Sequence, residues 1–132
     1  MRQYFAVIAS LAILSCVLAR AVSAQEEGTS PILQCYQLAR DKTLLDSTES
    51  QELCRGTTSL GPAYCYMSGD TETFLDTDDL IALCRCADST VPVTCYVQAR
   101  TQTDLWTPDA LRICSTIFVK HLWPDCTPRE AY

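Results

Sequence analysis

The sequence is poor in histidine and has fewer basic than acidic residues. Its only histidine is His121, and no serine or free thiol is placed as a nucleophile beside it, so hydrolysis by a nucleophile and base has no local support. The chain has ten Lys and Arg residues and 16 Asp and Glu residues, which gives a formal net charge of −6. Nucleic acids and anionic membranes attract basic surfaces. We therefore expect no enzyme activity and no nucleic-acid partner.

Metal motifs are missing as well. The densest acidic stretch lies between Asp70 and Asp79, but it lacks the ligand order, central glycine and closing glutamate of an EF-hand loop. Cys84 and Cys86 are separated by one residue, as in some redox and zinc motifs, yet Cys84 belongs to the repeat described below. The sequence thus predicts no metal site and no cofactor.

No apolar run is long enough to predict a membrane span. The longest starts at Tyr4, ends at Leu18 and is followed by Arg20, whereas a span needs about 20 apolar residues. A basic start, a short apolar core and small residues before the cleavage point are typical of a secretory signal peptide. We predict cleavage after Ala24. The mature chain, residues 25–132, is then secreted, either extracellular or, in a bacterium, periplasmic, without a membrane span.

Cysteine is abundant. The chain has nine cysteines, and eight remain once Cys16 leaves with the predicted signal peptide. An even number in a small exported chain is typical of a disulfide framework.

Six of these cysteines follow a period of 30 residues. They form the two series Cys35, Cys65, Cys95 and Cys54, Cys84, Cys114. The same period relates three other sets of residues: Tyr36, Tyr66, Tyr96; Thr43, Thr73, Thr103; and Leu45, Leu75, Leu105. A fixed period of this size is typical of stacked supersecondary units.

Each unit is predicted to form two short helices. The first begins near a proline, which suits a helix start: Pro31, Pro62 and Pro92. The second begins at a hydroxyl residue suited to capping: Ser47, Thr77 and Thr107. Strands are the alternative, because residues 91–97 are rich in β-branched side chains, but the proline and cap spacing favours helices.

The third unit differs at its end. An apolar pattern at i, i+3 and i+4 continues past Cys114 to Leu122, which predicts a longer helix reaching about Trp123 and ending at Pro124. We expect this C-terminal helix to cap the open end of the stack.

Two disulfide patterns are compatible with the spacing. In an antiparallel hairpin, the start of the first helix lies beside the end of the second. This favours pairing within each unit: Cys35 with Cys54, Cys65 with Cys84, Cys95 with Cys114, and the remaining Cys86 with Cys126. Pairing between units would leave Cys35 and Cys86 nearly two units apart, too far for a disulfide.

We therefore expect an all-α protein in which three disulfide-stapled helical hairpins stack into one domain over residues 31–126. A flexible N-terminus, residues 25–30, and a tail, residues 127–132, flank this domain. The expected function is that of a noncatalytic extracellular interaction module for a protein or glycan partner. The alternative is a carrier of a small apolar, lipid-like ligand in a cavity between helices, suggested by the apolar residues around Trp123. Bulky residues at the repeat positions favour a filled core over a cavity.

Overall fold

The computed structural model describes residues 28–129, so the predicted signal peptide lies outside the described residues. This part of the chain forms seven helices and no strand, which confirms the all-α prediction. The helices are α2 (Pro31–Lys42), α3 (Ser47–Cys54), α4 (Gly61–Glu72), α5 (Thr77–Cys84), α6 (Val91–Gln102), α7 (Thr107–Cys114) and α8 (Thr116–Val119). Residues 91–97, for which strand was the alternative, lie in α6.

The helix starts follow the prolines, but the predicted caps are one residue too late. Proline occupies the first or second position of α2, α4 and α6. The N-cap of α3 is Asp46, whose Oδ1 accepts the amides of Thr48 and Glu49 at 2.7 and 2.8 Å, while Glu49 accepts the amide of Asp46. Asp76 caps α5 in the same way through the amide of Asp79. Ser47 and Thr77 are therefore first helical residues, because a carboxylate one position earlier satisfies free amides. Thr107 is also the first residue of its helix, but its N-cap, Trp106, makes no side-chain cap hydrogen bond.

The recurring threonine ends the longer helices. Its Oγ1 donates to the carbonyl oxygen four residues earlier. The distance between these two oxygens is 2.6 Å for Thr43, 2.7 Å for Thr73 and 2.5 Å for Thr103. The same oxygen accepts the amide of the leucine two residues later at 3.2 to 3.3 Å. Since one hydroxyl satisfies a terminal carbonyl and a loop amide, the threonine and leucine spacing encodes the turn that follows each helix.

The prediction of a single long C-terminal helix is wrong. The helix α7 ends at Cys114, Ser115 is extended (φ −68°, ψ 131°), and α8 covers only four residues. The hydroxyl of Ser115 donates to the carbonyl of Ala82 in α5 at 2.9 Å. Arg55 and Arg85 are extended at the equivalent ends of α3 and α5. The third short helix therefore stops where the other two stop, despite the apolar pattern beyond it.

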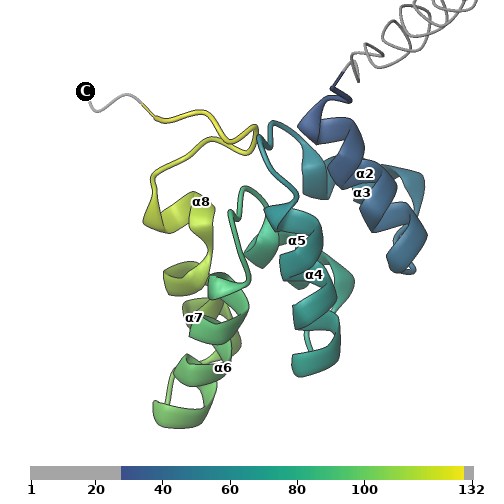
Figure 1. The fold of residues 1–132 in the computed structure, drawn as a ribbon. Coiled ribbons are helices and arrows are strands. Elements are labelled where there is room, and N and C mark those ends of the chain that lie inside the picture. The colour runs from purple at the N-terminus through teal and green to yellow at the C-terminus, as the bar shows by residue number, and fades with distance from the viewer. Residues whose placement is uncertain (1–27, 130–132) are drawn as a thin grey trace, which may run out of the picture.

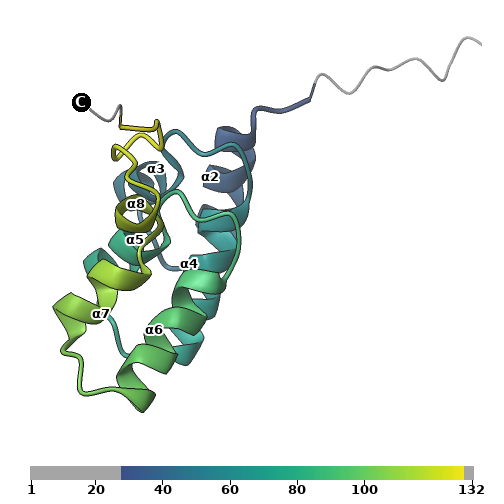
Figure 2. The same ribbon diagram turned by 90° about the vertical axis from the view of Figure 1, so that its left-hand side faces the viewer.

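The helices form two layers. Figures 1 and 2 show α2, α4 and α6 in one row and α3, α5 and α7 in the other, and neighbours within each row are in contact. The largest fully buried side chains between the rows include Leu53, Leu80, Leu83 and Val93. The core is thus filled by side chains from all three helix pairs.

The described residues form four disulfides, with Cα–Cα distances between 5.3 and 5.7 Å. The bonds are Cys35–Cys54, Cys65–Cys84, Cys95–Cys114 and Cys86–Cys126. The first three each join a longer helix to the shorter helix that follows it. The last ties the link before α6 to the segment after α8.

The segment after α8 returns across the molecule toward α3, as the yellow part of Figure 1 shows. The amide of Trp123 donates to the carbonyl of Thr127 at 2.8 Å, and the amide of Arg129 donates to the carbonyl of His121 at 2.9 Å. Residues 127–129 therefore belong to a hydrogen-bonded turn. Among the described helices, none combines the length and apolar character needed to cross a bilayer.

Candidate functional site

Three loops at one end of the molecule carry exposed apolar side chains. Figure 1 shows the α2–α3, α4–α5 and α6–α7 loops at the lower end, away from the C-terminal segment. Leu44 and Phe74 occupy equivalent loop positions and are exposed at 103% and 108%, and Trp106 is 75% exposed. We call these three side chains the loop edge.

The loop edge follows from the threonine turn. Successive side chains of an extended segment point in opposite directions. In the α2–α3 loop, Leu45 is buried, so the preceding Leu44 points to solvent. The same relation holds in the α4–α5 loop, where Leu75 packs against the core and Phe74 points outward. Because the threonine hydroxyl donates one hydrogen bond and accepts another in each turn, these apolar side chains project from ordered backbone.

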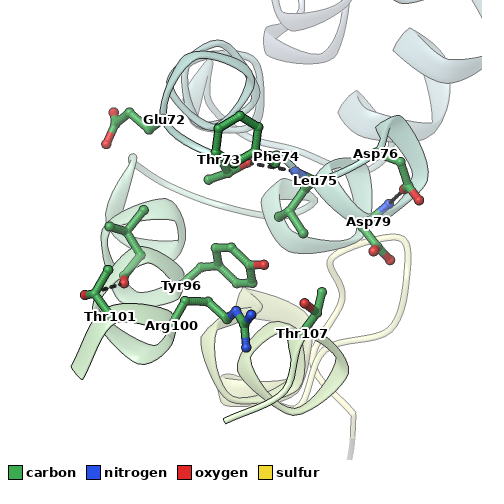
Figure 3. Close-up of a pocket in the computed structure, with 11 residues that line it drawn as sticks. Glu72, Thr73, Phe74, Leu75, Asp76, Asp79, Tyr96, Arg100, Thr101 and Thr107 are labelled. Carbon is green, nitrogen blue, oxygen red and sulfur yellow. Dashed lines mark hydrogen bonds between the residues drawn. The ribbon is translucent and has the colours of Figure 1, made fainter. Parts of the chain in front are cut away.

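A groove of about 480 Å³ opens beside Phe74. Figure 3 shows Phe74 and Leu75 on one side of it, Tyr96 and Arg100 of α6 on another, and Asp79 of α5 nearby. Tyr96 is buried and forms part of the groove wall. The guanidinium of Arg100 donates to the carbonyl of Leu105, which holds it against the α6–α7 loop.

Three acidic residues, Glu72, Asp76 and Asp79, line this groove together with Arg100. Residues 56–84 contain no Lys, Arg or His but five acidic residues, namely Asp70, Glu72, Asp76, Asp78 and Asp79. Burial, with the neighbouring carboxylates of Asp76 and Asp78, raises the pKa of Asp79 above its ordinary value. The crowding of like charges favours a cationic group beside the groove.

Tyr36, Tyr66 and Tyr96, each of which follows a cysteine, serve packing. Tyr66 and Tyr96 are only 5% and 8% exposed, and the hydroxyls of Tyr36 and Ser47 lie 3.2 Å apart. Burial raises the pKa of Tyr66, and its hydrogen bond with Thr77 opposes this shift. Ser47 and Thr77, which sequence analysis assigned as caps, are therefore partners of the tyrosine hydroxyls.

The other residues weighed in the sequence do not converge. His121 is exposed in the turn after α8. Phe118 and Trp123, which suggested a ligand cavity, are each 52% exposed, and the guanidinium of Arg129 lies 4.8 Å from the centre of the Trp123 ring. Within residues 28–129, no three His, Cys, Asp or Glu side chains gather as a metal site.

Comparison of the chain with protein-family models, curated proteins and solved structures gives no match. Function must therefore be inferred from the surface described above. Sequence analysis missed Leu44 and Phe74; the available indication was an apolar residue between the recurring threonine and leucine.

Proposed function

We propose that this protein is a noncatalytic, extracellular interaction module that binds a protein or glycan partner through its loop edge. The observation that carries the proposal is the full exposure of Leu44 and Phe74 on hydrogen-bonded loops. Exposed apolar side chains that gather on one surface, rimmed by polar residues, are typical of interaction sites. Four disulfides are consistent with an oxidising compartment.

We further propose that the scaffold consists of three stacked helical-hairpin units. Each candidate unit has a 12-residue helix, an 8-residue helix, the same threonine turn and one internal disulfide. Contacts join each helix to its equivalent in the next pair. Such a scaffold holds the loop edge in one geometry, which lowers the entropy lost when a partner binds.

The loop edge offers an apolar anchor, Phe74, beside acidic residues. Phe74 offers a large side chain of the kind that often dominates binding energy at interfaces. The acidic residues around it favour a partner with basic groups, through electrostatic attraction during encounter. Trp106 offers a further aromatic face at the α6–α7 loop.

Photo-crosslinking tests this proposal. Benzoylphenylalanine would replace Phe74, and in a control protein Tyr64, which is 50% exposed at the start of α4. Both proteins would be irradiated in the extracellular fluid of the source. We expect a product of defined mass at position 74 that is absent at position 64. Identical products at both positions, or none at position 74, would refute the proposal. A displaceable small apolar molecule found by native mass spectrometry would instead favour the carrier.

A further inference from the structure

The molecule has two contacts between successive helix pairs, and residues 30 positions apart are buried at both. Ala63 of α4 and Val93 of α6 are 30 residues apart and both are 0% exposed. A Cβ added at Gly69 of α4 would lie 3.2 Å from Cγ2 of Val93. Val93 of α6 therefore faces the preceding helix pair, α4 and α5. Leu53 of α3 and Leu83 of α5 are also 0% exposed. We attribute the burial of both pairs of positions to the neighbouring helix pair.

At the two ends of the molecule, the equivalent positions are uncovered. Leu33 of α2 corresponds to Ala63 and Val93 and is 54% exposed. Ile113 of α7 corresponds to Leu53 and Leu83 and is 52% exposed. We call the surface of Ile32 and Leu33 the N-face, and the surface of Val91 and Ile113 the C-face. They are the two halves of an interface that the molecule already uses twice.

The C-face is hollowed. A groove of about 400 Å³ lies between the start of α6 and the end of α7, and its lining includes Val91, Cys95, Ile113 and Val119. The N-face supplies Leu33 where the internal interface has Val93, so an exposed apolar side chain is available to enter this groove.

We propose that the N-face of one molecule binds the C-face of another, so that copies continue the stack head to tail. This inference rests on the three-unit scaffold proposed above, but it does not involve the loop edge. Because the two faces differ, the contact is heterologous and its repetition gives open chains of copies.

One charge opposes this contact. Inside the molecule, Arg85 pairs with Glu52 of the preceding helix pair. In the head-to-tail register, the equivalents are Arg55 of the incoming copy and Arg112 of the receiving one. Like charges at this point weaken association, and salt screens them. We therefore expect association to tighten at high ionic strength. Arg112→Glu would place a glutamate opposite Arg55, as Glu52 lies opposite Arg85 inside the molecule. This change should tighten the association of copies about fivefold.

Sedimentation velocity of the disulfide-intact protein over a range of concentrations tests the proposal. We expect the average mass of the wild type to rise with concentration at 0.5 M NaCl. Leu33→Glu and Ile113→Glu should each remain monomeric. An equimolar mixture of these two variants should form dimers and nothing larger, because one intact N-face then meets one intact C-face. Circular dichroism would verify that both variants, at half-exposed positions, are folded.

Leu44→Glu on the loop edge is the matched control and should associate as the wild type does. The inference is overturned if the wild type stays monomeric at 0.5 M NaCl, if either end-face variant dimerises alone, or if their mixture does not dimerise. Loss of association in the Leu44 control would place the contact on the loop edge instead. Crosslinking at Phe74 in the monomeric Ile113→Glu protein tests the proposed function separately, so either proposal can fail without the other.

Discussion

Replacing Gly56 with alanine tests how the C-terminal segment is held. Gly56 has φ +70°, and an added Cβ would overlap the carbonyl group of Asp125 and approach its Cα to 3.1 Å. Left-handed backbone costs a non-glycine residue about 1–2 kcal/mol, and overpacking adds about 1–3 kcal/mol. Asp125 has little freedom to move away, since the next residue, Cys126, is bonded to Cys86. We expect Gly56→Ala to lower the free energy of unfolding by about 2–5 kcal/mol in all.

The assay is urea unfolding followed by circular dichroism with the disulfides intact, comparing midpoints at equal slope. Gly28→Ala is the matched control, because an added Cβ there meets nothing within 4 Å; its effect should stay within about 0.5 kcal/mol. The same Gly56 change in a Cys86→Ala, Cys126→Ala background should cost only the backbone part, about 1–2 kcal/mol. Equal costs in both backgrounds, or an effect no larger than that of Gly28→Ala, would refute this reasoning.

Three further predictions concern stability. Cys65→Ala and Cys84→Ala, singly or together, should each lower the free energy of unfolding by roughly 3 kcal/mol in the same urea assay, because either change opens one loop; a double variant much worse than the singles would show that the two are not partners. Thr73→Val leaves the amide of Leu75 without its side-chain acceptor and should cost about 1 kcal/mol by thermal unfolding, whereas Thr101→Val, on the exposed side of α6, should cost less. Burial raises the pKa of Asp79, so its ionised form opposes folding and wild-type stability falls as the pH rises through the folded pKa. Asp79→Asn should therefore raise the urea midpoint at pH 7, and this gain should vanish in a titration toward pH 3.8, the ordinary pKa.

Several features of the fold could be predicted because their causes are local. Prolines restrict backbone torsions wherever they stand, and the structure begins α2, α4 and α6 at or beside one. The cap of α3 was predicted one residue late because Asp46 and Ser47 are both good caps, and only backbone geometry distinguishes them.

The end of α7 illustrates a cause that is not local. The apolar pattern through Ile117 and Leu122 favours a continued helix. The structure breaks it at Ser115, whose hydroxyl reaches the carbonyl of Ala82, 33 residues earlier. No pattern within the segment carries that information, since the partner belongs to another helix.

The candidate site has the same limitation. The sequence shows Phe74 as one apolar residue among many, and burial would be the ordinary expectation for phenylalanine. The threonine turn and the inward Leu75 place it in solvent instead. The groove beside it exists only because α6 brings Tyr96 and Arg100 alongside the α4–α5 loop.

By itself, the sequence determined the helical class and the position of six helices, because cysteines, prolines and threonines act over a few residues at a regular spacing. The tertiary structure decided where the third helix pair stops, which apolar side chains remain in solvent and which faces are left uncovered at the two ends. Those outcomes depend on packing between separate helices, such as the contact between Ser115 and Ala82, 33 residues earlier. Burial is a property of the packed molecule, so no single segment of the chain specifies it.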